Sequence, residues 1–156
     1  MNYSLQRDQT GGSLPASSVS LQCLLDTVLK KLPASIQNNK VIIVNRIHPS
    51  FMIEADPVTL APVVSELINT VGRNARNTII TVRAEKFRDT VMLVMEDPNN
   101  YNGYALSFSL MGLEEQARFI GGDISITGAR QRVATVSLSF PGMCTMPFTA
   151  ESWMLT

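Results

Sequence analysis

Four polar side chains follow one another at helical spacing near the middle of the sequence: Glu66, Asn69, Thr70 and Arg73. Residues four apart lie on the same face of a helix, so Glu66 and Thr70 project together, whereas Asn69 points about 100° away from Thr70. A carboxylate can act as a base, a hydroxyl oxygen can help to hold Mg²⁺, and a guanidinium can contact a phosphate. In a second interpretation, Glu66, Asn69 and Arg73 form the solvated face of an amphipathic helix.

Another candidate is a carboxylate at the end of an apolar segment. Residues 91–97 read VMLVMED, which indicates a strand that ends in Asp97. Pro98 and Asn99 follow, and Asp-Pro-Asn is a common way to begin a turn. Asp97 therefore has two open interpretations, as a binding residue at the end of a strand or as an ordinary turn residue.

Residues 107–122, SFSLMGLEEQARFIGG, predict a helix over about 107–120 that ends at Gly121 and Gly122. Ser107 can cap its N-terminus, where free backbone N–H groups and the helix dipole favour anions. The nine residues between Asp97 and Ser107 allow only a short loop. A plain amphipathic helix capped by serine is the alternative.

The elements that must position these residues can be predicted from periodicity and turn residues. Ser20 caps a helix that runs to Pro33, and a turn covers residues 35–39. Asp56 and Pro57 open the helix that carries Glu66, and Pro62 should make this helix bend or start late. Strands are expected at 41–47, 51–55, 78–87, 90–97, 123–129 and 132–140, with hairpin turns at Arg88-Asp89 and Arg130-Gln131.

This order predicts an α+β fold, a two-layer α/β sandwich whose mixed, mostly antiparallel sheet is covered on one face by about three helices. Over residues 19–141, the order resembles the ATP-binding domain shared by histidine kinases, gyrase-type ATPases and Hsp90 chaperones, the GHKL superfamily with its Bergerat fold. The resemblance implies ATP and Mg²⁺ as cofactors.

The helix around Glu66 carries the first part of the resemblance. Asp56–Leu60 and Ser65–Arg73 look like the family's D-x-x-x-L and E/N-L-x-x-N-A-x-K pattern. This implies Glu66 as the catalytic base and Arg73 as a phosphate contact. Thr70, the implied metal ligand, stands where the family has asparagine, and its shorter side chain holds a metal more weakly.

The other two stretches would contact the nucleotide. Asp97 matches the aspartate of the family's D-x-G-x-G box, which accepts from the adenine amino group, with Asn99 and Tyr101 at the glycine positions. Residues 107–122 look like G-x-G-L-x-G-M-x-E-R-A-x-x-L-G-G of sensor kinases of the nitrate-sensor and desaturase-regulator type. There Ser107 and Ser109 replace two phosphate-binding glycines, and Gly112 is retained.

Composition excludes several classes of protein. Thirteen basic and thirteen acidic residues cancel, so no overall field favours nucleic acid or membrane lipid. Cys23 and Cys144 lie far apart, and His48, the sole histidine, lies in a turn before Pro49, which suits neither a zinc site nor a phosphate acceptor. We expect a cytoplasmic, monomeric protein with a flexible leader (1–18), one domain (19–141) and a tail (142–156) that carries Trp153.

Three functions fit these observations. The first is a degenerate catalytic domain of a two-component sensor histidine kinase, with weak or lost ATP binding, which would phosphorylate a histidine on a separate dimerisation domain. The second is a non-catalytic module of the same fold that binds a response regulator or a sigma factor. The third is an unrelated α/β sandwich, in which the motifs have arisen by chance.

Overall fold

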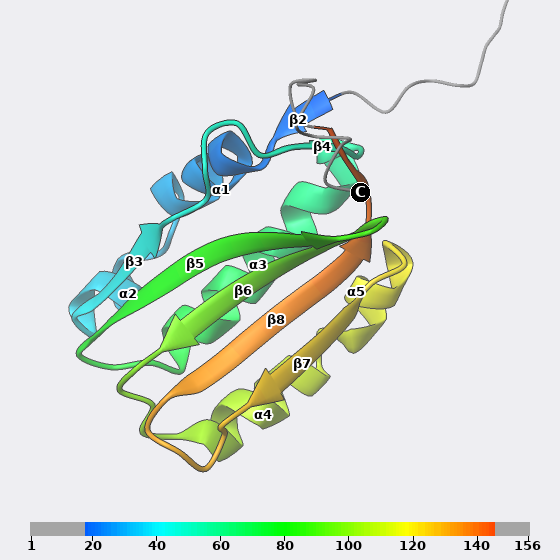
Figure 1. Ribbon diagram of the computed structural model, residues 1–156. Coiled ribbons are helices and arrows are strands. Elements are labelled where there is room, and N and C mark those ends of the chain that lie inside the picture. The colour runs from blue at the N-terminus through cyan, green and yellow to red at the C-terminus, as the bar shows by residue number, and fades with distance from the viewer. Residues whose placement is uncertain (1–17, 146–156) are drawn as a thin grey trace, which may run out of the picture.

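The computed structural model describes residues 18–145. A five-stranded sheet forms one layer and the helices form the other (Figure 1). The elements are β2 (Ser18–Ser20), α1 (Leu21–Lys30), α2 (Ala34–Asn38), β3 (Val41–Asn45), β4 (Met52–Glu54), α3 (Pro57–Arg73), β5 (Thr78–Phe87), β6 (Thr90–Asp97), α4 (Gly103–Met111), α5 (Glu114–Phe119), β7 (Asp123–Thr127), β8 (Ala134–Pro141) and β9 (Met143–Thr145).

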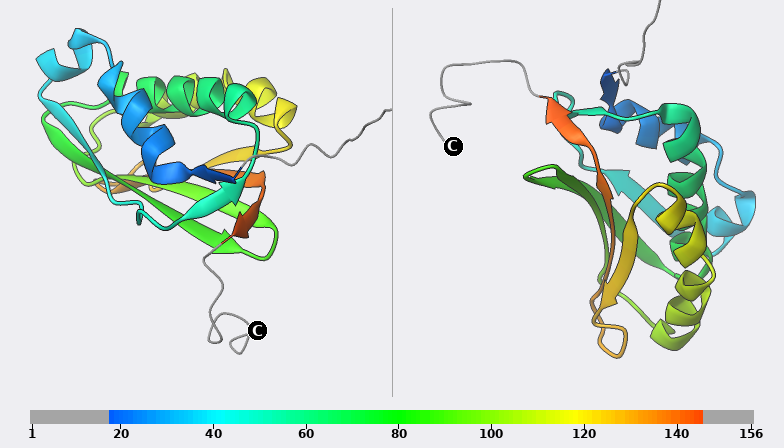
Figure 2. Two further views of the ribbon diagram at one scale, coloured as in Figure 1. Left: turned by 90° about the horizontal axis from the view of Figure 1, so that it is seen from above. Right: turned by 90° about the vertical axis from the view of Figure 1, so that its right-hand side faces the viewer.

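The large sheet has the order β3-β5-β6-β8-β7. β3 pairs with β5 in parallel, and all other neighbours in this sheet are antiparallel. The helices cover one face of the sheet (Figure 2). The predicted two-layer sandwich with a mixed, mostly antiparallel sheet is therefore confirmed.

A second, small sheet joins the two ends of the described chain. β4 lies between β2 and β9, with Met52 opposite both Ser20 and Thr145. The strand expected at 51–55 thus exists, but it belongs to this small sheet. Residues 143–145, which the sequence places in the tail, form one of its strands. Residues 1–17 and 146–156, with most of the predicted leader and tail, lie outside the described residues.

The first two long helices begin where the sequence predicts. Ser20 Oγ accepts a hydrogen bond from the N–H of Cys23, which caps α1. Asp56 Oδ1 accepts from the N–H of Val58 and caps α3, which starts directly at Pro57. The expectation of a late start was wrong, because Pro62 lies inside the helix with its ring exposed to solvent.

Two local predictions were wrong. The turn expected at 35–39 is the short helix α2. The single helix expected at 107–120 consists of two helices, α4 and α5, and it begins four residues earlier, at Gly103. Asn102 caps α4 by accepting from the N–H of Ala105, and this cap competes successfully with a serine cap at residue 107. Gly112, which has a low helix propensity, ends α4.

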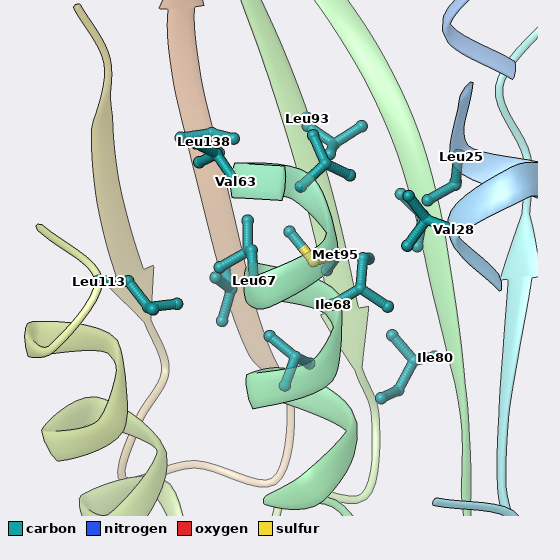
Figure 3. Close-up of a cluster of buried hydrophobic side chains, with 14 of the residues drawn as sticks. Leu25, Val28, Val63, Leu67, Ile68, Ile80, Leu93, Met95, Leu113 and Leu138 are labelled. Carbon is teal, nitrogen blue, oxygen red and sulfur yellow. The ribbon is translucent and has the colours of Figure 1, made fainter. Parts of the chain in front are cut away.

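The core lies between α3 and the inner face of the sheet. One stripe of α3 carries Val63, Leu67 and Ile68, which point toward Leu93 of β6 and Leu138 of β8 (Figure 3). Leu67, Leu93 and Leu138 have no exposed surface. This packing fixes the orientation of α3, and with it the directions in which Glu66, Asn69 and Thr70 project.

Candidate functional site

The polar side chains of α3 fall into two environments. Glu66 and Arg73 are exposed, whereas Thr70 is 1% exposed. The Thr70 hydroxyl oxygen accepts a hydrogen bond of 3.4 Å from Arg73 Nη2. A guanidinium therefore stands beside the oxygen that was predicted to hold Mg²⁺, and its positive charge opposes a metal ion there.

Asn69 lies next to Thr70 on α3 and is half-buried. Its Oδ1 atom is buried and has no hydrogen-bond partner in the structure. A buried oxygen without a donor costs free energy unless something outside the described chain supplies one. Asn69 therefore presents a buried acceptor with spare capacity on this helix.

Asp97 lies at the end of β6 and is 4% exposed. Its Oδ1 atom accepts a 2.7 Å hydrogen bond from the hydroxyl of Thr78 and a 2.9 Å hydrogen bond from the N–H of Asn99. The Asn99 side chain in turn donates to the carbonyl oxygen of Asn77 at 3.1 Å. The carboxylate thus holds the turn after β6 against the start of β5, a geometry that suits the interpretation of Asp97 as a turn residue.

The connection from β6 to α4 consists only of residues 98–102. Asn100 ties it to the β7–β8 turn: its N–H donates to the carbonyl of Arg132 at 2.8 Å, and its Nδ2 donates to the carbonyls of Ala129 at 3.1 Å and Gln131 at 2.8 Å. Tyr101, at one of the family's glycine positions, lies under the guanidinium of Arg76 at 4.7 Å. This connection is even shorter than the sequence predicts.

Gly103 brings the start of α4 against the same turn. A Cβ atom added to Gly103 would lie 1.7 Å from the carbonyl oxygen of Ala129, a contact that backbone atoms do not permit. Gly103 itself is buried. The first turn of α4 and the β7–β8 turn are therefore packed backbone to backbone at Gly103 and Ala129.

The serines predicted to bind phosphate lie inside α4. Only the first four N–H groups of a helix lack an acceptor within the helix, and in α4 these are the N–H groups of residues 102–105. The N–H of Leu106 already donates to the carbonyl of Asn102. The N–H groups of Ser107 and Ser109 are therefore engaged in the helix. Gly112 is the C-cap, and its N–H donates to the carbonyl of Ser109 at 3.1 Å. The expected anion-binding helix N-terminus at residues 107–112 is not formed.

Sequence reasoning missed the residues that build this region: Asn100, Asn102 and Gly103. The sequence PNNYNGY favours a loop here because Asn and Gly are frequent turn residues. Asn102 directly before Gly103 was a usable signal, since Asn is a strong N-cap and the apolar residues of a helix follow it.

The predicted residues do not line a common opening. None of five surface cavities formed by the described residues has Glu66, Asn69, Thr70 or Asp97 in its lining. An open cavity of about 750 Å³ is lined by residues 99–104 and 129–132, which belong to the β6–α4 connection, the start of α4 and the β7–β8 turn.

Within residues 18–145, no three His, Cys, Asp or Glu side chains gather as a metal site would require. His48 is exposed, and its Nδ1 lies 2.7 Å from Ser50 Oγ.

In the described part of the chain, no helix has the length and apolar character needed to cross a membrane. No protein-family model matches the sequence, and no curated protein matches it either.

Solved structures match the fold. The histidine kinase AdeS of Acinetobacter baumannii is 14% identical with a TM-score of 0.65, over 80% of this chain and 66% of AdeS. Full-length ShkA, solved in complex with AMPPNP, is 13% identical with a TM-score of 0.65, over 84% of this chain and 32% of ShkA. This chain thus spans about two thirds of the first structure and one third of the second.

The catalytic domain of the histidine kinase ThkA is 16% identical with a TM-score of 0.60, over 83% of this chain and 98% of that domain. Because this match covers nearly the whole of an isolated catalytic domain, the shared fold is that of the catalytic domain. The chain has the fold of the catalytic domain of histidine kinases.

Proposed function

We propose that this chain is a module of two-component signalling that has lost ATP binding and acts in the cytoplasm by binding a protein partner. The kinase-like fold supports the signalling context. The observation that carries the loss of ATP is the start of α4 at Gly103, packed on Ala129, because it places the predicted phosphate-binding residues Ser107 and Ser109 inside the helix and Gly112 at its C-terminal end.

Triphosphate binding needs free N–H groups or cations around the phosphates. At the positions that resemble the family's phosphate loop, the N–H groups of Ser107, Ser109 and Gly112 already have partners within α4. Backbone that is committed to a helix can contact a phosphate only if the helix unwinds. These residues therefore do not fit a triphosphate.

Adenine and Mg²⁺ fit no better. The Oδ1 atom of Asp97 already accepts from Thr78 and Asn99, and the side chain is buried. The Thr70 oxygen accepts from Arg73, a cation. A metal ion at Thr70 would have to displace Arg73. An adenine amino group would find Oδ1 of Asp97 occupied and only Oδ2 of this buried carboxylate free to accept. Both arrangements support the loss of nucleotide binding.

Weak nucleotide binding is the second candidate. The unpartnered Oδ1 atom of Asn69 favours it, because a bound group could supply the missing donor. The match to ShkA, whose structure contains AMPPNP, also favours it. In that case Glu66 is the candidate base, and the phosphate acceptor is a histidine on a separate dimerisation domain.

Calorimetric titration of the purified protein with Mg²⁺ and a non-hydrolysable ATP analogue separates the two candidates. We expect no heat of binding at millimolar nucleotide, where a ligand with a Kd of ~1 mM has a binding free energy of only about −4 kcal/mol. Asp97→Asn is the matched variant, because an amide oxygen can still accept from Thr78 and Asn99. Micromolar binding that this variant abolishes would overturn the proposal.

The partner side of the proposal has its own measurement. A purified receiver domain of a response regulator, a histidine-containing dimerisation domain and a sigma factor are the three classes of partner to titrate. Saturable binding to one of them, unchanged by added nucleotide, is the expected result. Binding that requires Mg²⁺ and ATP would instead favour the catalytic candidate.

A further inference from the structure

An apolar groove of about 530 Å³ runs between α1 and α3 on the helical layer. Val19 of β2, Leu24 and Val28 of α1, and Val58 and Pro62 of α3 line it. Val58 is 80% exposed, so no other part of residues 18–145 covers this apolar side chain at the rim of the groove. Such a surface favours an apolar occupant.

The end of the described chain lies close to this groove. Thr145, the last residue of β9, is opposite Met52, and Met52 is opposite Ser20, which lines the groove. Neighbouring strands are about 4.8 Å apart, so Thr145 is roughly 10 Å from Ser20. The following residues, 146–156, can span about 36 Å when extended, at ~3.3 Å per residue. The segment is therefore long enough to reach every part of the groove.

The composition of residues 146–156, MPFTAESWMLT, matches the lining of the groove. Five of its side chains are large and apolar, and Glu151 is its only charged residue. The groove in turn has one charged side chain in its lining, Lys31. An apolar segment with one carboxylate thus faces an apolar groove with one ammonium group. The apolar side chains of the segment are Met146, Phe148, Trp153, Met154 and Leu155.

We propose that residues 146–156 bind in the groove between α1 and α3, with Trp153 in contact with its apolar walls. This inference goes beyond the proposed function and does not depend on whether ATP binds. It assigns a contact to Trp153, the sole tryptophan of the chain.

Tryptophan fluorescence of the full chain tests the contact directly, because Trp153 is the only tryptophan. We expect blue-shifted emission that is shielded from iodide. Val58→Glu should shift the emission to the red and lower the ratio of bound to free segment about tenfold, since a carboxylate would be pressed against apolar side chains. An acidic residue in the first turn of α3 is favourable for the helix, so this variant should fold.

Phe108→Glu is the matched control, because Phe108 is 77% exposed on α4 and does not line the groove. This variant should leave the emission unchanged. Solvent-like emission in the unmodified chain, or equal responses to the two substitutions, would overturn the proposal. So would emission that depends on protein concentration, since the groove would then hold a segment of a second copy.

The reactivity of Cys23 is an independent readout, because Cys23 is exposed and lines the groove. In a Cys144→Ser background, the alkylation rate of Cys23 should rise several-fold when Trp153 is changed to Ser. An unchanged rate would mean that Trp153 does not cover Cys23 and would contradict the proposal even if the fluorescence variants failed to fold.

Discussion

The hydroxyl of Thr78 donates a 2.7 Å hydrogen bond to Oδ1 of Asp97, and both residues are buried. The two residues lie at the beginning of β5 and the end of β6. Because the same oxygen also accepts from the N–H of Asn99, one carboxylate connects a strand start, a strand end and the following turn. This relationship makes Asp97 a structural residue whatever else it contacts.

Asp97→Ala should therefore lower the free energy of unfolding by about 3 kcal/mol, since two donors lose a charged acceptor in a buried place. Urea denaturation followed by circular dichroism measures this loss. Asp123→Ala is the control, because Asp123 is exposed and its substitution should change stability by less than about 0.5 kcal/mol. Equal losses in the two variants would show that the buried hydrogen bonds contribute nothing.

Two glycines of the α4 region should differ in their tolerance of alanine. Gly103→Ala places a methyl group 1.7 Å from the Ala129 carbonyl, so α4 or the β7–β8 turn must move. We expect a loss of about 3 kcal/mol or more, as for severe overpacking. Gly112→Ala, whose nearest contact is 3.3 Å away, should stay within about 1 kcal/mol of the unmodified protein. Thermal denaturation of both variants decides whether the backbone contact is as close as described.

Placing at residue 70 the asparagine of the kinase pattern that the sequence resembles should not create nucleotide binding. Thr70 is 1% exposed, and a larger amide side chain overpacks its site, at a cost of about 1–3 kcal/mol. The variant Thr70→Asn should thus unfold at a lower temperature, and Mg²⁺ with ATP should not raise that temperature. A ligand-dependent increase, as mass action predicts for any nucleotide that binds the folded state, would show a latent site.

Asn100→Ala should loosen the β7–β8 turn. The side chain donates to the carbonyls of Ala129 and Gln131, and its removal leaves both without this donor. A loss of about 1–2 kcal/mol is expected, with faster hydrogen exchange in residues 128–133. Asn38→Ala is a suitable comparison, because Asn38 is exposed on α2, and exchange in residues 128–133 should not change. Equal exchange of residues 128–133 in both variants would mean that the hydrogen bonds from Asn100 to this turn are not formed in solution.

The elements with a strong period could be predicted from sequence. In α1 and α3, apolar residues recur every three or four positions, and Ser20 and Asp56 are efficient caps. The starts predicted from these two caps therefore agree with the structure. α4 lacks such a signal, because exposed Tyr104, Phe108 and Met111 make its outer face as apolar as its inner one. Ser107 is a possible N-cap, and the predicted start at residue 107 is therefore four residues too late.

Site residues were harder to interpret than elements. The sequence identifies Asp97 as a carboxylate at a strand end, but its partner Thr78 is nineteen residues away, and the choice between a binding and a structural role depends on that contact. Likewise, Gly103 and Ala129 meet only because β8 returns beside β6. Contacts of this kind are set by tertiary packing, which local spacing does not encode.

The parallel pairing of β3 with β5 has a consequence for the order in which the sheet opens. β3 is an edge strand whose ladder runs to β5 alone, and residues 46–77, including all of α3, must fold between the two. The β5–β6 hairpin closes over a turn at Arg88 and Asp89, so its ladder needs no long-range closure. β3 should thus detach as a unit at a lower free energy than the central strand β6, and native-state hydrogen exchange would register it as the first strand of the sheet to open.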